Sequence, residues 1–116
     1  MKWLPLFGLV LFLTACSSSE KEPEIPGVRT SLDAPIPTPA MAKRHSASWE
    51  SISLGHSVYM RKCGECHLHL LPDQIASQDW RDHVTEMSEK SGISPEEESA
   101  LRDYMITAAK EAEAKR

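Results

Sequence analysis

The sequence predicts a small all-α domain of about three helices. Apolar residues recur at helical spacing over three separate segments, and a complete capping box opens the last of them. No stretch shows the alternation of apolar and polar residues that is typical of a strand. A length of 116 residues is enough for one domain, which we expect to follow a signal peptide and a proline-rich tether.

The expected ends of these helices are inferred from the spacing of apolar residues and from residues that commonly cap helices. We expect helices over about 47–62, over about 78–90, and from Pro95 to a C-terminal end near Lys115-Arg116. Ser46 or Ser48 is the expected N-cap of the first helix and Ser77 that of the second, while Gly92 is a C-cap glycine. Ser94 begins the S-x-x-E capping box of the third.

One short motif, Cys63-Gly64-Glu65-Cys66-His67, carries the most informative chemistry in the chain. Two thiols three positions apart, with a histidine after the second, form the pattern for covalent haem attachment. Each cysteine forms a thioether with one haem vinyl group, and the histidine becomes an axial ligand of the iron. Cys63, Cys66 and His67 are therefore predicted to hold one covalent haem c. Three alternatives stay open: a zinc site that includes His69, a redox-active C-x-x-C pair, and a structural disulfide.

The first fifteen residues resemble a bacterial secretory signal. Met1-Lys2 is positively charged, Trp3–Leu13 is almost wholly apolar, and Leu13-Thr14-Ala15-Cys16 resembles the lipobox of bacterial lipoproteins. We predict a lipoprotein signal peptide over 1–15 and lipidation of Cys16. The alternatives are an ordinary signal peptide with a chance cysteine and an uncleaved anchor. Because lipid takes one of three cysteines and haem the other two, no odd thiol remains.

This leader predicts a membrane-anchored lipoprotein that faces the periplasm of a Gram-negative bacterium. Covalent haem attachment also takes place outside the cytoplasm, so the leader and the motif indicate the same compartment. Ser17, rather than an aspartate, favours the outer membrane. Residues 16–46 hold five prolines and few large apolar side chains, which predicts the lipidated cysteine and a flexible linker, followed by the domain over 47–116.

His67 can fill only one axial position of the iron, and Met87 is the first candidate for the other. Met87 follows His67 by 20 residues and shares an apolar helix stripe with Trp80. A methionine on such a stripe is more often a core residue than a ligand. The competing candidates are His83 and His69, which would give two histidine ligands, and then Met105.

The charge of the chain excludes one class of partner. The formal net charge is −4, and residues 47–116 hold eight Lys or Arg against thirteen Asp or Glu, a net of −5. Binding to nucleic acid requires a basic face, so we expect no nucleic-acid partner. An acidic surface would steer a basic redox partner, or it serves only to keep the protein soluble.

Two spaced patterns carry a family resemblance: Gly55-x-x-x-Tyr59-x-x-x-Cys63-Gly-Glu-Cys66-His67 and Trp80-x-x-x-Val84-x-x-Met87. They resemble small c-type cytochromes over roughly residues 48–110. In that family a small residue of the first helix packs against an aromatic residue of the last, roles that Gly55 and Tyr104 match. The resemblance implies that Met87 is the axial methionine, although the interval from His67 is shorter than in the usual class I layout.

Together these features predict a membrane-anchored electron carrier rather than an enzyme. Its haem, with His67 and Met87 as axial ligands, would pass single electrons between periplasmic or respiratory redox partner proteins, or within a larger respiratory complex. The alternatives are a bis-histidine carrier, a haem sensor or peroxidase-like protein with an open or displaceable sixth position, and a zinc lipoprotein without haem.

Overall fold

The computed structural model describes residue 27 and residues 29–63 and 70–116 of the chain. All regular structure in these residues is helical, which confirms the predicted all-α class. The elements are η1 (Ser31–Asp33), α1 (Pro39–Arg44), α2 (Trp49–Lys62), η2 (Pro72–Gln74), η3 (Ser77–Asp79), α3 (Trp80–Ser91) and α4 (Pro95–Ala114).

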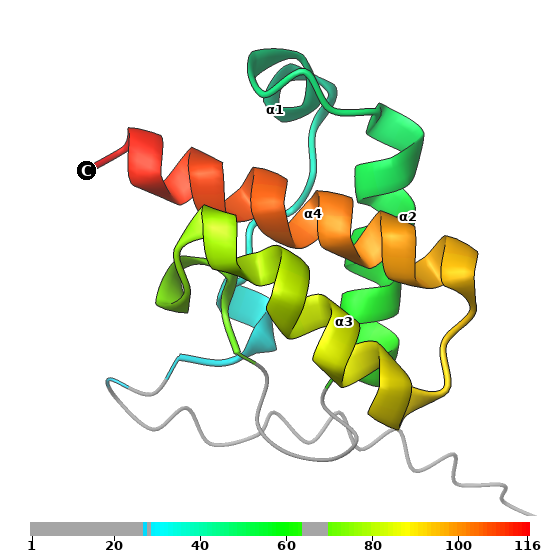
Figure 1. Ribbon diagram of the computed structural model, residues 1–116. Helices are drawn as coiled ribbons and strands as arrows, with labels where there is room; N and C mark the ends of the chain where they lie inside the picture. The colour runs from blue at the N-terminus through cyan, green and yellow to red at the C-terminus, as the bar shows by residue number, and fades with distance from the viewer. Residues whose placement is uncertain (1–26, 28, 64–69) are drawn as a thin grey trace, which may run out of the picture.

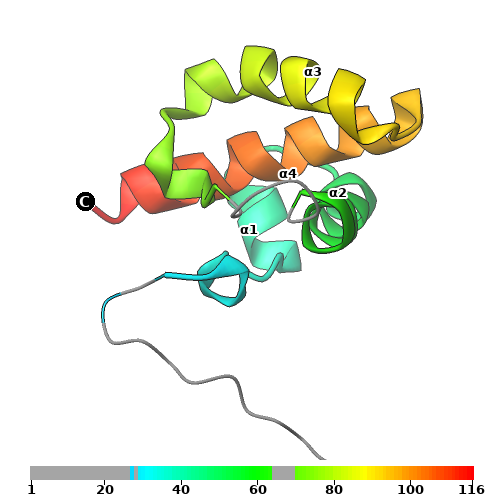
Figure 2. The ribbon, with the colours of Figure 1, turned by 90° about the horizontal axis from the view of Figure 1, so that it is seen from below.

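Helix α4 is the element against which the rest of the domain packs. It contacts α1, α2 and α3, and also the short turns η2 and η3. Figures 1 and 2 show α2 crossing one side of α4 while α3 runs along the other. Because neighbours cover α4 on several sides, it buries more residues than any other described helix: Ala100, Leu101, Tyr104, Met105, Thr107, Ala108, Ala109 and Glu111.

The crossing of α2 and α4 depends on a glycine. A Cβ atom added at Gly55 would overlap the backbone carbonyl oxygen of Ala100 and would lie 2.7 Å from Cβ of Tyr104. Only a residue without a side chain therefore permits this approach. The expected packing of Gly55 against Tyr104 is confirmed.

The helix ends agree with the predicted caps at three of four positions. The hydroxyl of Ser48 accepts a hydrogen bond from the amide of Ser51, Ser94 forms the capping box, and Gly92 ends α3 with φ of 66°. The prediction for Ser77 was wrong, because a 3-10 turn precedes α3 and the helix begins only at Trp80. Ser77 instead donates its hydroxyl to the carboxylate of Glu113 at 3.0 Å, so a tertiary contact replaces the local cap.

The predicted linker over 16–46 is in part a folded segment. Helix α1 lies within it, capped by Thr38, and Met41 and Ala42 are each only 3% exposed. The hydroxyl of Tyr104 donates to the carbonyl of Pro35 at 2.8 Å. The domain therefore begins well before residue 47, because two buried side chains and long-range hydrogen bonds compensate for the low apolar content of the segment.

A buried carboxylate fastens α1 to α4. Glu111 accepts hydrogen bonds from Arg44 at 2.6 Å and 3.2 Å, and its Oε2 lies 2.8 Å from Nε2 of His45. Nζ of Lys115 lies 3.4 Å from Oε1. These contacts, led by the hydrogen bond from Arg44, lower the pKa of Glu111 to about 2. Glu111 is only 7% exposed, so its negative charge is kept in the interface by three basic neighbours.

Candidate haem site

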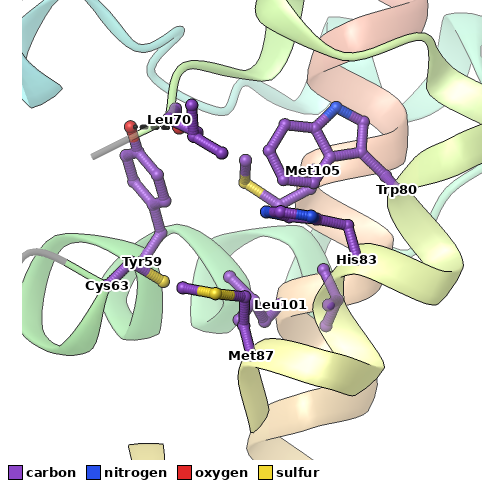
Figure 3. Close-up of a pocket in the computed structure, with 9 residues that line it drawn as sticks. Tyr59, Cys63, Leu70, Trp80, His83, Met87, Leu101 and Met105 are labelled. Carbon is purple, nitrogen blue, oxygen red and sulfur yellow. Dashed lines mark hydrogen bonds between the residues drawn. The ribbon is translucent and has the colours of Figure 1, made fainter. Parts of the chain in front are cut away.

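An apolar cavity lies between the C-terminal end of α2, the start of the chain after the motif, and the facing sides of α3 and α4 (Figure 3). About 340 Å³ of space between these elements is free of protein atoms, part of it open to solvent. Its lining combines aromatic, aliphatic and sulfur-containing side chains: Tyr59, Cys63, Leu70, Trp80, His83, Val84, Met87, Leu101 and Met105. No acidic or basic residue other than the histidine is among these.

Cys63 is the one residue of the attachment motif that the structure describes. It is the C-cap of α2, and its amide donates to the carbonyl of Tyr59 at 3.3 Å. Burial raises the pKa of the thiol to about 11, so the thiol stays protonated at neutral pH, unlike the activated cysteine of a redox C-x-x-C pair. Cys66 and His67, and also the competing ligand His69, lie outside the described residues.

Helix α3 supplies one wall of the cavity from a single face. Trp80, His83 and Met87 recur there at helical spacing. The indole of Trp80 donates to the carbonyl of Pro72 at 2.8 Å, and its ring meets that of His83 edge-on with centroids 5.3 Å apart. The buried Trp80 therefore holds the start of α3 against η2 and sets the position of the wall.

Three of the four candidates for the second axial ligand line this cavity. Met87 and His83 are both half-buried on α3, whereas Met105 is 2% exposed at the back of the cavity on α4. In Figure 3 the thioether of Met87 reaches toward the sulfur of Cys63. The fold thus brings Met87 to the residue that begins the attachment motif, although 24 positions separate them.

Tyr59 forms the wall opposite α3. It is 1% exposed, and its hydroxyl donates to the carbonyl of Leu70 at 3.1 Å. Burial raises the pKa of this phenol to about 12, so the hydroxyl remains a donor at physiological pH. Through this bond Tyr59 fixes the point at which the chain returns to the domain after the motif.

A second cavity adjoins the first, and both are lined by Cys63, Met87 and Leu101. It is partly open to solvent, and its further lining residues are Lys62, Lys90, Ser91 and Ile93. Sequence patterns did not indicate these four as site residues. The only available signal was the position of Lys62 next to Cys63 and of Lys90 one turn after Met87.

The lining residues suit haem c. The lining of the first cavity is almost wholly apolar, as a porphyrin requires. The thiol of Cys63, which can form a covalent bond to a haem vinyl group, lies at one side of the cavity. The facing helix carries the sulfur of Met87 and the imidazole of His83, both of which can bind iron. Among the described residues no group of three His, Cys, Asp or Glu side chains is gathered as for a metal ion bound by protein alone.

The chain matches the family model for dihaem cytochrome c over residues 59–116. The chain belongs to this family. The match begins at Tyr59 and spans the attachment motif, both walls of the cavity and all of α4. The protein therefore carries a c-type cytochrome domain that binds haem c and transfers electrons. No curated protein and no solved structure matches the chain.

The family match and the fold support the predicted haem domain but do not test the predicted lipid anchor. The haem domain is confirmed, whereas the lipid anchor at Cys16 lies outside the described residues. In the part of the chain that the structure describes, no helix has the length and apolar character needed to cross a bilayer.

Proposed function

We propose that this cytochrome carries one haem c, attached to Cys63 and Cys66, with His67 and Met87 as axial ligands. The observation that supports it most is the apolar cavity in which Met87 faces Cys63. The family name specifies two haems, but the 116 residues contain a single C-x-x-C-H motif and only one further cysteine, Cys16. We infer one haem because the chain offers attachment groups for one.

When bound, haem c supplies a one-electron couple between Fe(II) and Fe(III). The contribution of the protein is to exclude water and set the reduction potential. Tyr59, Trp80 and Leu101 supply apolar walls, and a thioether ligand raises the potential relative to two imidazoles. With Met87 as ligand, the protein belongs toward the oxidising end of a respiratory chain.

We further propose that lipid on Cys16 holds the protein at a periplasm-facing membrane, with redox proteins or a larger respiratory complex as partners. The described residues from 29 onward, including η1 and α1, belong to the folded domain, so the tether that we propose is shorter than residues 16–46. About twelve residues would then separate the lipid from the domain, an extended reach of roughly 40 Å. This proposal predicts a membrane-bound holoprotein that a Cys16→Ser substitution releases.

The test of the haem proposal is expression in a host that matures c-type cytochromes, followed by mass and absorbance measurements. We expect the mass of one haem, the methionine–ferric charge-transfer band, and slow binding of carbon monoxide by the ferrous form. Met87→Ala should abolish the band and permit rapid binding of carbon monoxide, whereas the matched substitution Met105→Ala should retain the band.

The other candidates give different results. Retention of a low-spin spectrum in Met87→Ala and its loss in His83→Ala would establish a bis-histidine carrier, which the place of His83 in the same cavity makes the second candidate. Rapid binding of carbon monoxide by the wild-type protein would indicate a sensor or peroxidase-like site. A colourless protein that contains zinc would contradict the proposal altogether.

A further inference from the structure

The segment Leu70–Asp73, which brings the chain back to the domain after the attachment motif, is held by hydrogen bonds from two walls of the first cavity. Tyr59 of α2 donates to the carbonyl of Leu70 at 3.1 Å. The indole of Trp80, at the start of α3, donates to the carbonyl of Pro72 at 2.8 Å. Because Tyr59 and Trp80 both line the cavity, the position of this segment affects the distance between its walls.

A further bond to this segment comes from a residue that composition assigns to the flexible linker. Nη1 of Arg29 donates to Oδ2 of Asp73, in η2, at 2.8 Å. Arg29 also interacts electrostatically with the phenol of Tyr59. It lies 30 positions before Tyr59, where the family match begins, so the family pattern does not include this contact.

The carboxylate of Asp73 has little other compensation. Its side chain is 26% exposed, and its Oδ1 is buried with no hydrogen-bond donor. Among the described residues, Arg29 is the one side chain that donates to this carboxylate. A partly buried carboxylate that loses its donor moves toward water, because an unpaired oxygen in the protein is costly. Loss of Arg29 would therefore draw η2 outward, away from the indole of Trp80.

Trp80 carries the position of η2 to the wall that holds the candidate ligands. It is the first residue of α3 and is 3% exposed. His83 and Met87 follow it on the face that lines the cavity. Because a helix transmits a displacement along its length, a shift of Trp80 would also shift Met87 relative to the haem.

We propose that Arg29 is a positioning residue for the haem: through Asp73 and η2 it holds Trp80, and with it the α3 wall, against the cofactor. The inference rests on the proposed haem site with Met87 as an axial ligand. The ion pair contributes little to the stability of the fold, because the side chain of Arg29 is 50% exposed. Its main effect is therefore expected at the haem rather than in global unfolding.

Hydrogen exchange of the Trp80 indole N–H tests the first step independently of the iron ligands. In the reduced holoprotein, followed by NMR, Arg29→Gln should speed this exchange about two- to fivefold, the range that an ion pair this exposed can supply. The indole of Trp49, 39% exposed at the start of α2, is the internal control and should not change. Unchanged exchange at Trp80 would overturn the proposal.

Carbon monoxide binding to the ferrous protein tests the second step, because Met87 must leave the iron before the gas binds. Arg29→Gln should speed binding about two- to fivefold. Arg29→Lys keeps a donor and should restore most of the wild-type rate, and Asp73→Ala should speed binding as Arg29→Gln does. Opposite effects of Arg29→Gln and Asp73→Ala would overturn the proposal, because a charge that acts through space changes sign between them.

The matched control is Arg44→Gln. Arg44 is in the same N-terminal segment, is 54% exposed and pairs with a carboxylate, but its partner Glu111 lines neither cavity. This variant should lower the stability of the domain, yet change Trp80 exchange and carbon monoxide binding by less than about twofold. Equal changes in Arg29→Gln and Arg44→Gln would overturn the proposal, because general loosening of the segment would then explain both.

Failure of the proposed ligation would appear separately, as absence of the methionine–ferric charge-transfer band in the wild-type protein. The exchange of the Trp80 indole would still decide whether Arg29 holds the α3 wall, since that measurement does not depend on which residue binds the iron.

Discussion

Gly55 and Gly92 are needed for different physical reasons. At Gly55 the limit is space, because a methyl group would overlap the backbone of α4. At Gly92 nothing lies within 4 Å of a built Cβ atom, and the limit is the left-handed backbone with φ of 66°. The first glycine determines how two helices cross, and the second only where one helix ends.

We expect Gly55→Ala to destabilise the protein by about 3 kcal/mol or more, because backbone atoms of α4 must move to admit the methyl group. Gly92→Ala should cost only about 1–2 kcal/mol, the cost of a left-handed alanine. Chemical denaturation of both variants measures the difference. Equal losses would show that α2 and α4 tolerate separation and that the close crossing contributes little.

At the scale of elements, α1 shows how a weak helix becomes part of a domain. Six residues are too few to form a stable helix in isolation. Thr38 and Pro39 favour its first turn, Met41 and Ala42 bury its apolar face, and Glu111 accepts hydrogen bonds from its end. The position of α1 is therefore determined by its tertiary contacts with α2 and with α4, which lies more than 50 residues later.

The stability of the α1–α4 contact should depend on pH in the acid range. The pKa of Glu111 falls from the usual 4.5 to about 2 in the folded state, so its contribution is complete above about pH 4.5 and is lost as pH falls toward 2. Thermal unfolding between pH 2 and 6 should show this loss in the wild-type protein and less of it in Glu111→Gln.

The matched control for this measurement is Glu89→Gln, a substitution at an exposed position of α3. It should keep the pH dependence of the wild-type protein. If Glu111→Gln and the wild-type protein instead lose stability in parallel below pH 4.5, the ionised carboxylate of Glu111 does not hold α1 to the domain.

At the scale of the whole molecule, the two sides of α4 differ in how they are packed. The side that meets α2 is filled by protein, whereas the side that faces α3 borders the cavities. Only Trp80, Val84 and Ser88 are buried on α3, against eight residues on α4. We therefore expect helix α3 to depend on the cofactor for part of its apolar contact.

We expect haem attachment to protect the amides of α3 more than those of α4. In a haem-free Cys63→Ser/Cys66→Ser variant, hydrogen exchange of α3 should be fast and that of α4 slow, since local stability follows the number of buried contacts. The holoprotein should show a large gain in protection for α3, because a ligand stabilises the state that binds it. An equal gain across both helices would contradict this division of the core.

Several elements were predictable from the sequence because their signals are local. A C-x-x-C-H string, a capping box and a helical stripe each need only residues within a few turns, so the haem motif, α4 and most of α2 and α3 were found. Ser77 failed as a cap because its partner, Glu113, lies 36 residues away. Helix α1 was missed for the same reason, since Pro35, Arg44 and His45 bond to residues of α4.

The sequence by itself determined the chemistry: one covalent haem motif, its helical setting and a short list of possible ligands. Only the tertiary structure decided which of those ligands share a cavity with Cys63, and which residues line the second cavity beside it. The reason is physical. Covalent reactivity belongs to single side chains and their spacing, whereas a cavity and a local potential arise from residues that packing alone brings together.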